Sequence, residues 1–206
     1  MNESPTVFLV DDDPAVRDAV GLLLRAGGLT VEGFANAAEF LATDAVRRPG
    51  CLVLDVRMPE MSGLDLQKKL RNDGCPMPII FMTGHGDVPM AIRAMKAGAL
   101  DFIEKPFSGE RLLTRVYEAL AIDARDRCRQ AQREAAATRL SRLSPREREV
   151  LDRVADGQYN KTIAAELDIS ISTVEIHRRR AMEKLEATSI ADLIRTLALA
   201  NDQAAR

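Results

Sequence analysis

Short apolar runs that each end at a charged residue or a hydroxyl constrain the fold of this 206-residue chain more than any other feature. Four such runs occupy residues 7–10, 51–54, 79–82 and 100–104. Runs of this length predict buried strands of a parallel sheet. Helical patterns lie between the runs, and residues 30–34 add a fifth candidate strand. The alternation predicts an α/β domain with a doubly wound sheet of five parallel strands.

Composition divides the chain into three parts. Residues 1–122 contain every strand signal and hold 13 Lys or Arg against 17 Asp or Glu. Residues 123–140 are rich in Ala, Arg and Gln, a composition that favours helix but cannot form a core. They predict a helical linker, continuous with the preceding helix, which is either a solvated spacer or a weak contact between two copies. Residues 141–206 predict a second, all-helical domain.

The second domain has the signals of four short helices. Ser144 and Glu147 form a capping box around Pro145, and Gly157 ends the helix that follows. A helix over residues 160–167, a tight turn and a helix over residues 172–185 follow. A fourth helix is expected to be capped by Ser189 and to turn Leu193, Ile194 and Leu197 inward. This arrangement predicts a helix-turn-helix module.

The residues that follow the predicted strands are suited to a cation and a phosphoryl group. Ligands of open α/β sheets bind at the carboxyl ends of the strands, so these residues are expected to converge. Asp12 and Asp55 are candidate ligands of Mg²⁺ (or Mn²⁺), and Asp11 is expected to act through water. Asp13 is better explained as a charge at the start of the next helix.

The same cluster predicts phosphoryl chemistry. The Asp55 carboxylate is a candidate nucleophile, because a carboxylate can accept a phosphoryl group covalently. The Lys105 ammonium and the Thr83 hydroxyl are expected to hold phosphoryl oxygens. A phosphoryl group adds about −1.5 to −2 charges and three acceptor oxygens, which can pull Thr83 and its loop inward.

Several motifs together carry a resemblance to a known family. They are Asp11-Asp12, Asp55-Val56-Arg57-Met58-Pro59, Met61-Ser62-Gly63, Thr83-Gly84-His85-Gly86 and Lys105-Pro106-Phe107, with residues 143–185 in the second domain. The chain resembles the two-component response regulators with a flavodoxin-like receiver domain and a LuxR-type output domain of the NarL/FixJ kind. Residues 84–89 are most similar to the FixJ branch.

The resemblance implies roles for individual residues. Asp55 would accept phosphate from a sensor histidine kinase and lose it again without being a turnover enzyme. The backbone carbonyl of Arg57 would complete the metal shell, and a cis bond would precede Pro106. Thr83 would be coupled to Phe102, which stands where many relatives have Tyr or His and which has no hydroxyl.

The resemblance also implies how the output is controlled. Phosphorylation would promote a homodimer through the face near Ile92, Lys96 and Phe102, and two output domains would then bind double-stranded DNA. RNA polymerase would be a further partner in regulating transcription.

The predicted third helix of the module is suited to DNA. Glu175, Ile176 and Arg179 share one face and are candidate base contacts, since Glu can accept from cytosine, Arg can pair with guanine and Ile can touch a thymine methyl. Better candidates for phosphate contacts are Lys161, Thr173, His177 and Arg178, with Lys184 adding to the basic helix.

Two other functions fit parts of the sequence. An Mg²⁺-dependent phosphohydrolase would also use Asp55 as nucleophile, but such enzymes usually need an acid two residues later, where this chain has Arg57. A phosphorylation-gated protein-binding module would use the helical domain on protein or RNA. Cys51, Cys75 and Cys128 lack a paired metal spacing, and no signal peptide or membrane-spanning stretch is evident. A cytoplasmic protein is therefore expected.

Overall fold

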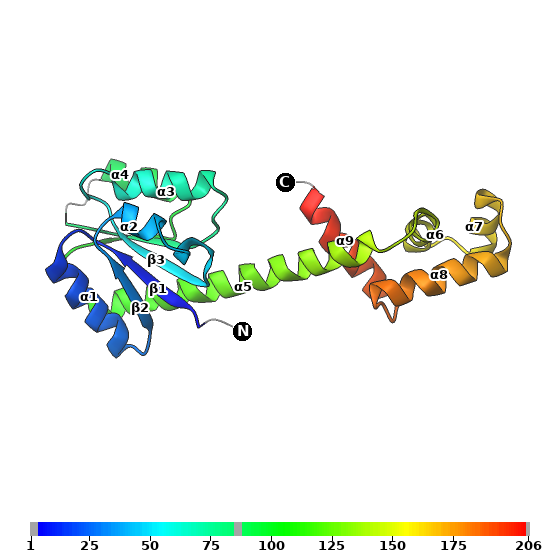
Figure 1. The fold of residues 1–206 in the computed structure, drawn as a ribbon, viewed down its shortest axis with the longest axis horizontal. Coiled ribbons are helices and arrows are strands. Elements are labelled where there is room, and N and C mark those ends of the chain that lie inside the picture. Colours follow the sequence, from blue (N-terminus) through cyan, green and yellow to red (C-terminus); the bar gives the residue numbers. More distant parts are fainter. Residues whose placement is uncertain (1–3, 85–87, 205–206) are drawn as a thin grey trace. The chain divides into compact units, whose positions relative to one another are not determined.

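The computed structural model describes residues 4–84 and 88–204, and its first part is a five-stranded parallel sheet (Figure 1). The strands are β1 (Thr6–Val10), β2 (Thr30–Phe34), β3 (Gly50–Asp55), β4 (Ile79–Thr83) and β5 (Asp101–Glu104). Their order in the sheet is β2-β1-β3-β4-β5. This confirms the predicted doubly wound sheet. β1, β3 and β4 extend one residue beyond the apolar runs at one end or at both, and β5 begins one residue later than its run.

Helices cover both faces of the sheet (Figure 1). One face is covered by α1 (Pro14–Ala26) and α5 (Gly109–Ser141), and the other by α2 (Ala37–Leu41), α3 (Gly63–Asn72) and α4 (Val88–Lys96), with the 3₁₀ helix η1 (Ala45–Arg47) before β3. Side chains alternate along each strand, so Phe8 packs in the α2–α3–α4 core and Leu9 in the α1–α5 core. Burial on both faces explains why the central strands read as continuous apolar runs.

The strand register brings the carboxyl ends of four strands to one edge of the sheet. Val10 of β1 aligns with Leu54 of β3. Asp55 aligns with Met82 of β4, and Thr83 aligns with Glu104 of β5. The polar residues at these ends are therefore placed side by side by the backbone alone.

The opposite edge of the sheet, its amino-terminal base, is attached to α5. Asp123 is only 3% exposed, and its Oδ2 accepts a hydrogen bond from the Gly50 N–H at 2.9 Å. Arg127 donates through Nε to Asp123 and through its two terminal nitrogens to the carbonyl oxygens of Arg47 and Arg48. We call these contacts the α5 anchor. They fasten one turn of α5 to the start of β3.

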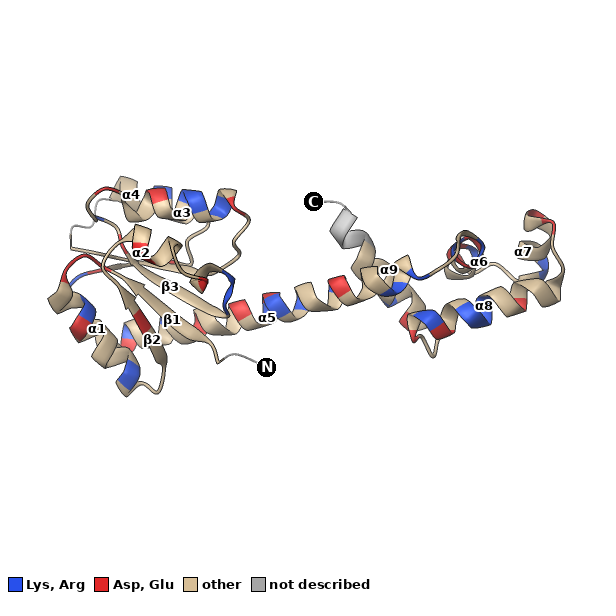
Figure 2. Ribbon diagram, viewed as in Figure 1, with Lys and Arg blue, Asp and Glu red and all other residues tan. Residues whose placement is uncertain are grey.

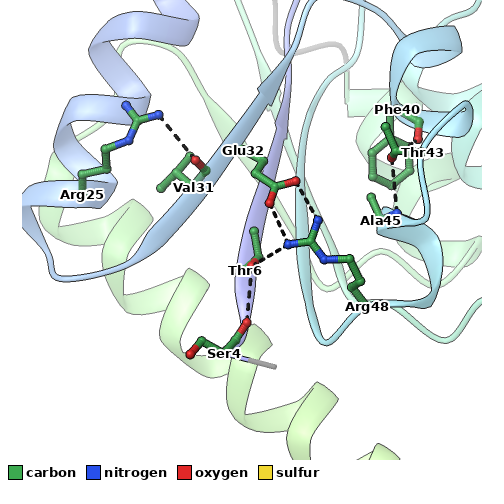
Figure 3. Close-up of polar contacts among 9 residues, drawn as sticks. All are labelled: Ser4, Thr6, Arg25, Val31, Glu32, Phe40, Thr43, Ala45 and Arg48. Carbon is green, nitrogen blue, oxygen red and sulfur yellow. Dashed lines mark hydrogen bonds and ion pairs between the residues drawn. The ribbon is translucent and has the colours of Figure 1, made fainter. Parts of the chain in front are cut away.

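A second polar group lies at the same base (Figure 3). The Arg48 guanidinium binds both carboxylate oxygens of Glu32 on β2, at 2.6 and 2.9 Å, and contacts the Thr6 hydroxyl at 3.4 Å. It also lies 5.3 Å from the ring centroid of Phe8. The bidentate pair ties the loop before β3 to the edge strand β2.

The second part of the chain is helical. Its helices are α6 (Pro145–Ala155), α7 (Asn160–Leu167), α8 (Ile171–Leu185) and α9 (Ile190–Ala204). The capping box of Ser144 and Glu147 is present, as predicted. Asp168 ends α7 in the left-handed conformation at φ 53°, and the Ser170 hydroxyl caps α8 by accepting from the Thr173 N–H. These caps produce the predicted helix-turn-helix.

The core of the helical part differs from the prediction at one residue of α9. Leu193 is buried and Leu197 is partly buried, as expected, but Ile194 is 49% exposed. On a helix, residues 193 and 197 are one turn apart and share a face, whereas residue 194 is rotated by about 100° from Leu193. The prediction that Ile194 points inward was therefore wrong.

The chain forms two compact units, Met1–Arg127 and Cys128–Arg206, and α5 contributes to both. Residues 123–140, predicted as a helical linker, lie wholly within α5. They are less solvated than a spacer, because Asp123 is buried in the first unit while Ala136 and Leu140 are buried in the second. Among the described residues, no helix is long and apolar enough to cross a membrane.

Candidate functional site

The Lys105 ammonium joins two of the strand ends. It donates to Asp11 Oδ2 at 2.7 Å and to Asp55 Oδ1 at 2.8 Å. The backbone N–H of Lys105 donates to the carbonyl oxygen of Thr83 at 2.7 Å, and the bond to Pro106 is cis, as the resemblance implied. Asp11, Asp55, Thr83 and Lys105, from the ends of four strands, thus lie at one place.

Asp55 is held on both sides. Its side chain is buried, Oδ1 accepts from Lys105, and Oδ2 accepts from the Arg57 N–H at 2.7 Å. Burial raises the pKa of Asp55 above its ordinary value, and this effect outweighs the hydrogen bonds from Lys105 and Arg57, which lower it. The carboxylate is therefore partly desolvated, and each of its oxygens is held by a hydrogen bond.

The pKa of Lys105 is set by a different balance between burial and hydrogen bonding. Burial lowers its pKa, but the hydrogen bonds to Asp11 and Asp55 outweigh burial, so its pKa lies above the ordinary value. The group is a fixed cation at neutral pH. A fixed cation beside a carboxylate suits a site where a phosphoryl group is transferred.

The acid loop after β1 separates its three carboxylates, as predicted. Asp11 is buried and accepts from Lys105 and, through Oδ1, from the Asp13 N–H at 3.0 Å. Asp13 caps α1 by accepting from the Ala15 N–H at 2.9 Å. Asp12 lies between them with its side chain exposed. Asp13 therefore belongs to the helix, and Asp11 and Asp12 remain candidates for the cation.

A divalent cation fits the donors at this edge. Among the residues that the structure describes, no three His, Cys, Asp or Glu side chains gather into a ready cage. Two buried carboxylates, those of Asp11 and Asp55, do converge on a single positive charge. Mg²⁺ is usually held by one or two carboxylates, with waters and phosphate oxygens completing the octahedron, so a cage of three acids is not required.

Thr83 and Phe102 lie on neighbouring strands. Thr83 is buried at the end of β4. Phe102 is partly buried, and its ring centroid lies 6.2 Å from that of Phe81, its register partner. Phe81 and Thr83 are two residues apart on β4, so their side chains and that of Phe102 are on the same face of the sheet. The switching roles of Thr83 and Phe102 stay predictions.

A groove of about 410 Å³ opens beside the site. Its lining is largely apolar and consists of Ala15, Val16, Ala19, Val20, Leu23, Lys105, Pro106 and Phe107. Lys105 thus contacts Asp55 and also lines this groove. The sequence reasoning missed the groove, because its lining comes from segments about 90 residues apart.

The reasoning also missed Arg17 of α1. Its Nη1 donates to the carbonyl oxygen of Asp11 at 2.7 Å. The signal that would have found it is a basic side chain in the first turn of a helix, where positive charge is unfavourable without a specific acceptor.

The residues predicted as base contacts are exposed on the helical unit. Val174, Ala181 and Leu185 of α8 are buried against α6 and α7. Glu175, Ile176 and Arg179 are exposed on other faces of α8, and Ile176 is an apolar side chain 41% exposed. Lys and Arg colour the middle of α8 blue in Figure 2. A basic, exposed helix in a helix-turn-helix is suited to a nucleic-acid groove.

The predicted phosphate contacts are less uniform. Lys161 is exposed, whereas Thr173 and His177 are half-buried. Arg178 donates to the Asn160 side chain at 3.3 Å. Lys184 donates to Glu147 Oε2 at 2.6 Å and so has a partner in the capping box. Lys184 therefore has a structural role that the sequence reasoning missed, and its contact with DNA stays a prediction.

Comparison with protein families matches both units. Residues 7–117 match the response regulator receiver domain, and residues 141–197 match the bacterial regulatory proteins of the luxR family.

Named relatives match nearly the whole chain. It is 45% identical over 194 residues to the response regulator protein TodT of Pseudomonas putida, covering 94% of this chain and 86% of that protein. It is 44% identical over 200 residues to the transcriptional regulatory protein FixJ of Azorhizobium caulinodans, covering 97% and 95%.

Solved structures agree. The response regulator StyR matches with a TM-score of 0.89 and 43% identity, over 95% of this chain and 99% of that one. Full-length FixJ from B. japonicum matches with a TM-score of 0.59 and 40% identity, over 97% and 98%.

Proposed function

The chain belongs to the two-component response regulators that control transcription through a LuxR-type DNA-binding domain, and we propose that phosphorylation of Asp55 governs its binding to DNA. The observation that carries the proposal is the meeting of Asp11, Asp55 and Lys105 at the strand ends. A chemically competent acceptor site and an exposed basic helix in one chain support a phosphate-operated regulator.

The proposed transfer uses the side chains already in contact. A carboxylate oxygen of Asp55 attacks the phosphorus of a phosphohistidine, the P–N bond breaks, and an acyl phosphate forms on Asp55. Lys105 then binds a phosphoryl oxygen in place of a carboxylate oxygen, and the Thr83 hydroxyl donates to another. Mg²⁺ (or Mn²⁺), held by Asp11, Asp12, Asp55 and the Arg57 carbonyl, would neutralise charge on the phosphoryl oxygens.

The donor of the phosphoryl group is proposed to be a sensor histidine kinase. The groove lined by Lys105, Pro106 and Phe107 supports a docking place beside Asp55, since its apolar lining suits a protein surface. A kinase bound there would present its phosphohistidine at the open edge of the sheet.

Phosphorylation is proposed to favour a homodimer. Val88, Ile92 and Met95 are exposed apolar residues on α4, which follows the loop after Thr83. Movement of Thr83 toward the phosphoryl group, with Phe102 following on the same face, would reshape this surface near Lys96. A complete shift from mostly inactive to mostly active requires roughly 5.5 kcal/mol of bias, which a dimer contact plus phosphate contacts can supply.

Two output domains in the dimer are proposed to bind half-sites about one helical turn of DNA apart. Glu175, Ile176 and Arg179 would contact base edges, and Lys161, Thr173, His177 and Arg178 would contact phosphates. RNA polymerase is the expected further partner. Because the proposed partner is DNA, we expect the protein to act in the cytoplasm.

The test compares wild type with Asp55→Asn in the presence of Mg²⁺ and a small phosphodonor such as acetyl phosphate. We expect dimerisation and DNA protection to increase in wild type only, as measured by analytical ultracentrifugation and footprinting. Equal dimerisation and equal protection in the two proteins would refute the proposal. Phosphorylated wild type that dimerises without protecting DNA would refute only the output step.

The side chain at position 57 gives no support to a phosphohydrolase. Arg57 is exposed, and it contributes its backbone N–H, not an acid, to Asp55. The site therefore suits a phosphoacceptor better than a turnover enzyme.

A further inference from the structure

Arg17 of α1 binds the acid loop, the segment after β1 that carries Asp11, Asp12 and Asp13. It lies in the first turn of α1, and its Nη1 donates to the carbonyl oxygen of Asp11 at 2.7 Å. The stem of the side chain passes Gly33 of β2, where Arg17 Cδ lies 3.9 Å from the position that a Cβ would occupy. Arg17 as a whole is half-buried.

All three oxygens of Asp11 accept hydrogen bonds. Oδ1 accepts from the Asp13 N–H, Oδ2 accepts from Lys105, and the carbonyl oxygen accepts from Arg17. The first two bonds fix the side chain of Asp11. The third fixes the peptide plane that joins Asp11 to Asp12, because the carbonyl oxygen belongs to that plane.

The orientation of that peptide sets the direction of the Asp12 side chain. Asp12 is exposed, in contrast to the buried Asp11 on its amino-terminal side. Its backbone N–H and the carbonyl oxygen held by Arg17 are parts of the same rigid unit. A rotation of this unit would therefore redirect the Asp12 carboxylate.

The charge of Arg17 cannot be its contribution to a cation site. A guanidinium near Asp11 and Asp12 repels a divalent cation, and positive charge at the start of a helix is unfavourable. Charge and geometry therefore predict opposite results when Arg17 is removed: the loss of a repelling charge tightens metal binding, whereas the loss of an orienting bond weakens it.

We propose that Arg17 is a positioning residue that aims the Asp12 carboxylate at the cation site by holding the Asp11 carbonyl oxygen. The inference rests on the proposed role of Asp12 as a metal ligand. It adds to the site a residue that supports a ligand from outside the metal shell.

The test measures the dissociation constant of Mn²⁺ by electron paramagnetic resonance of the free ion, with Mg²⁺ as competitor, on the full chain. We expect Arg17→Ala and Arg17→Lys to weaken Mn²⁺ binding about tenfold, a loss typical of removing support from a metal ligand. Arg17→Lys keeps the charge but not the geometry of the bond.

Arg25→Ala is the matched control. Arg25 is on the same helix, carries the same charge and donates to a backbone carbonyl of β2, that of Val31, at 3.4 Å (Figure 3). We expect it to leave the dissociation constant of Mn²⁺ unchanged. Circular dichroism shows whether each variant is folded, and Arg17→Lys is the second variant if Arg17→Ala is not.

A double-mutant cycle with Asp12→Asn tests the route of the effect. If Arg17 acts through Asp12, Arg17→Lys causes no further loss in the Asp12→Asn background. At saturating Mn²⁺ the rate of phosphorylation by acetyl phosphate should return to the wild-type value in Arg17→Lys.

Wild-type or tighter Mn²⁺ binding in both Arg17 variants would overturn the inference, as would additive losses in the cycle. Equal binding by wild type and Asp12→Asn would instead overturn the proposed role of Asp12 itself. The two failures are therefore distinguishable.

Discussion

Lys105 is the residue on which the proposed phosphoryl site depends most. Its ammonium is the counter-charge within hydrogen-bonding distance of both Asp11 and Asp55. Removing one partner of a buried charged pair leaves the other desolvated and unpaired, which usually costs more than the pair itself contributes. In the proposed transfer Lys105 exchanges a carboxylate oxygen for a phosphoryl oxygen, so that its charge stays paired.

The three cysteines are expected to differ sharply in reactivity. Burial, with a smaller effect from the nearby Asp123, raises the pKa of Cys51 to about 12, and Cys75 is also buried, whereas Cys128 is exposed. Since the thiolate is the reactive form, titration of the native protein with Ellman's reagent at pH 7.5 should find one fast thiol of the three. Fast modification that persists in Cys128→Ser would contradict this.

Glu147 is expected to give the helical unit a pH-dependent stability. Burial raises its pKa, but the bonds from Lys184 and from the Ser144 N–H outweigh this, so the pKa lies below the ordinary value. A carboxyl with a lowered folded-state pKa stabilises the fold at neutral pH and loses that contribution as the pH falls through the folded-state pKa. Glu147→Gln should cost about 2 kcal/mol at pH 7 and progressively less below about pH 4.

Amide hydrogen exchange in α6–α9 measures this free energy separately from that of the first unit. The matched control is Glu149→Gln, since Glu149 pairs with Arg146 at 2.8 Å on the surface. A surface pair contributes little, so this variant should be nearly neutral at both pH values. A cost of Glu147→Gln that stays constant with pH would show that the carboxylate charge is not what stabilises the helix end.

At the scale of elements, the α5 anchor is the feature that the composition of the chain did not predict. Residues 123–140 have the composition of a solvated helix, and Asp123 and Arg127 look like ordinary surface charges within it. Their partners are backbone groups of Gly50, Arg47 and Arg48, more than 70 residues away. No local pattern reports such a contact.

Asp123→Ala is expected to release this part of α5. It would leave the Gly50 N–H without its acceptor and remove the carboxylate partner of Arg127, at a cost of about 2–3 kcal/mol to the first unit. Hydrogen exchange should speed up in residues 119–127 and at the start of β3. Asp126→Ala, at an exposed position of the same helix, should change neither region. Equal protection in wild type and Asp123→Ala would mean that apolar packing alone holds α5.

Periodicity explains which elements the sequence predicted well. The buried central strands and the capped helices were placed within a residue or two, because burial on both faces and the capping box leave local signals. The convergence of Asp55, Thr83 and Lys105 followed from parallel topology. The contact of Arg17 and the α5 anchor were not predicted. Each depends on a hydrogen bond to a backbone oxygen or N–H, and backbone groups carry no sequence signal.

At the scale of the whole molecule, the receiver part and the output part carry net charges of opposite sign. Residues 1–122 carry a net charge of −4 and residues 123–206 a net charge of +2. An acidic receiver suits a cation and discourages nonspecific binding to DNA, while α8 of the output carries Arg178, Arg179, Arg180 and Lys184. Because the net charge of residues 123–206 is only +2, we expect affinity for DNA to come from specific contacts rather than from overall electrostatic attraction.

The two kinds of proposed DNA contact are expected to separate by salt dependence. Arg179→Ala, at a proposed base contact, should cost about 1–3 kcal/mol on the operator and relax its sequence preference. Lys161→Ala, at a proposed phosphate contact, should weaken binding to all sequences and reduce the salt slope by about 1. Fluorescence anisotropy over a salt series measures both. An unchanged preference in Arg179→Ala would remove this residue from the proposed base contacts.

Strand β3 carries the proposed phosphate acceptor at one end and the attachment of α5 at the other. Asp55 is its last residue, and Gly50, its first, donates to Asp123. The two ends are about 16 Å apart along one strand of six residues. The Gly50 amide is therefore a built-in spectroscopic reporter: its resonance records how firmly α5 is held, at a distance where the phosphoryl group itself is not felt directly. Following that single signal during phosphorylation would measure whether the chemical event at Asp55 reaches the helix that leaves the receiver.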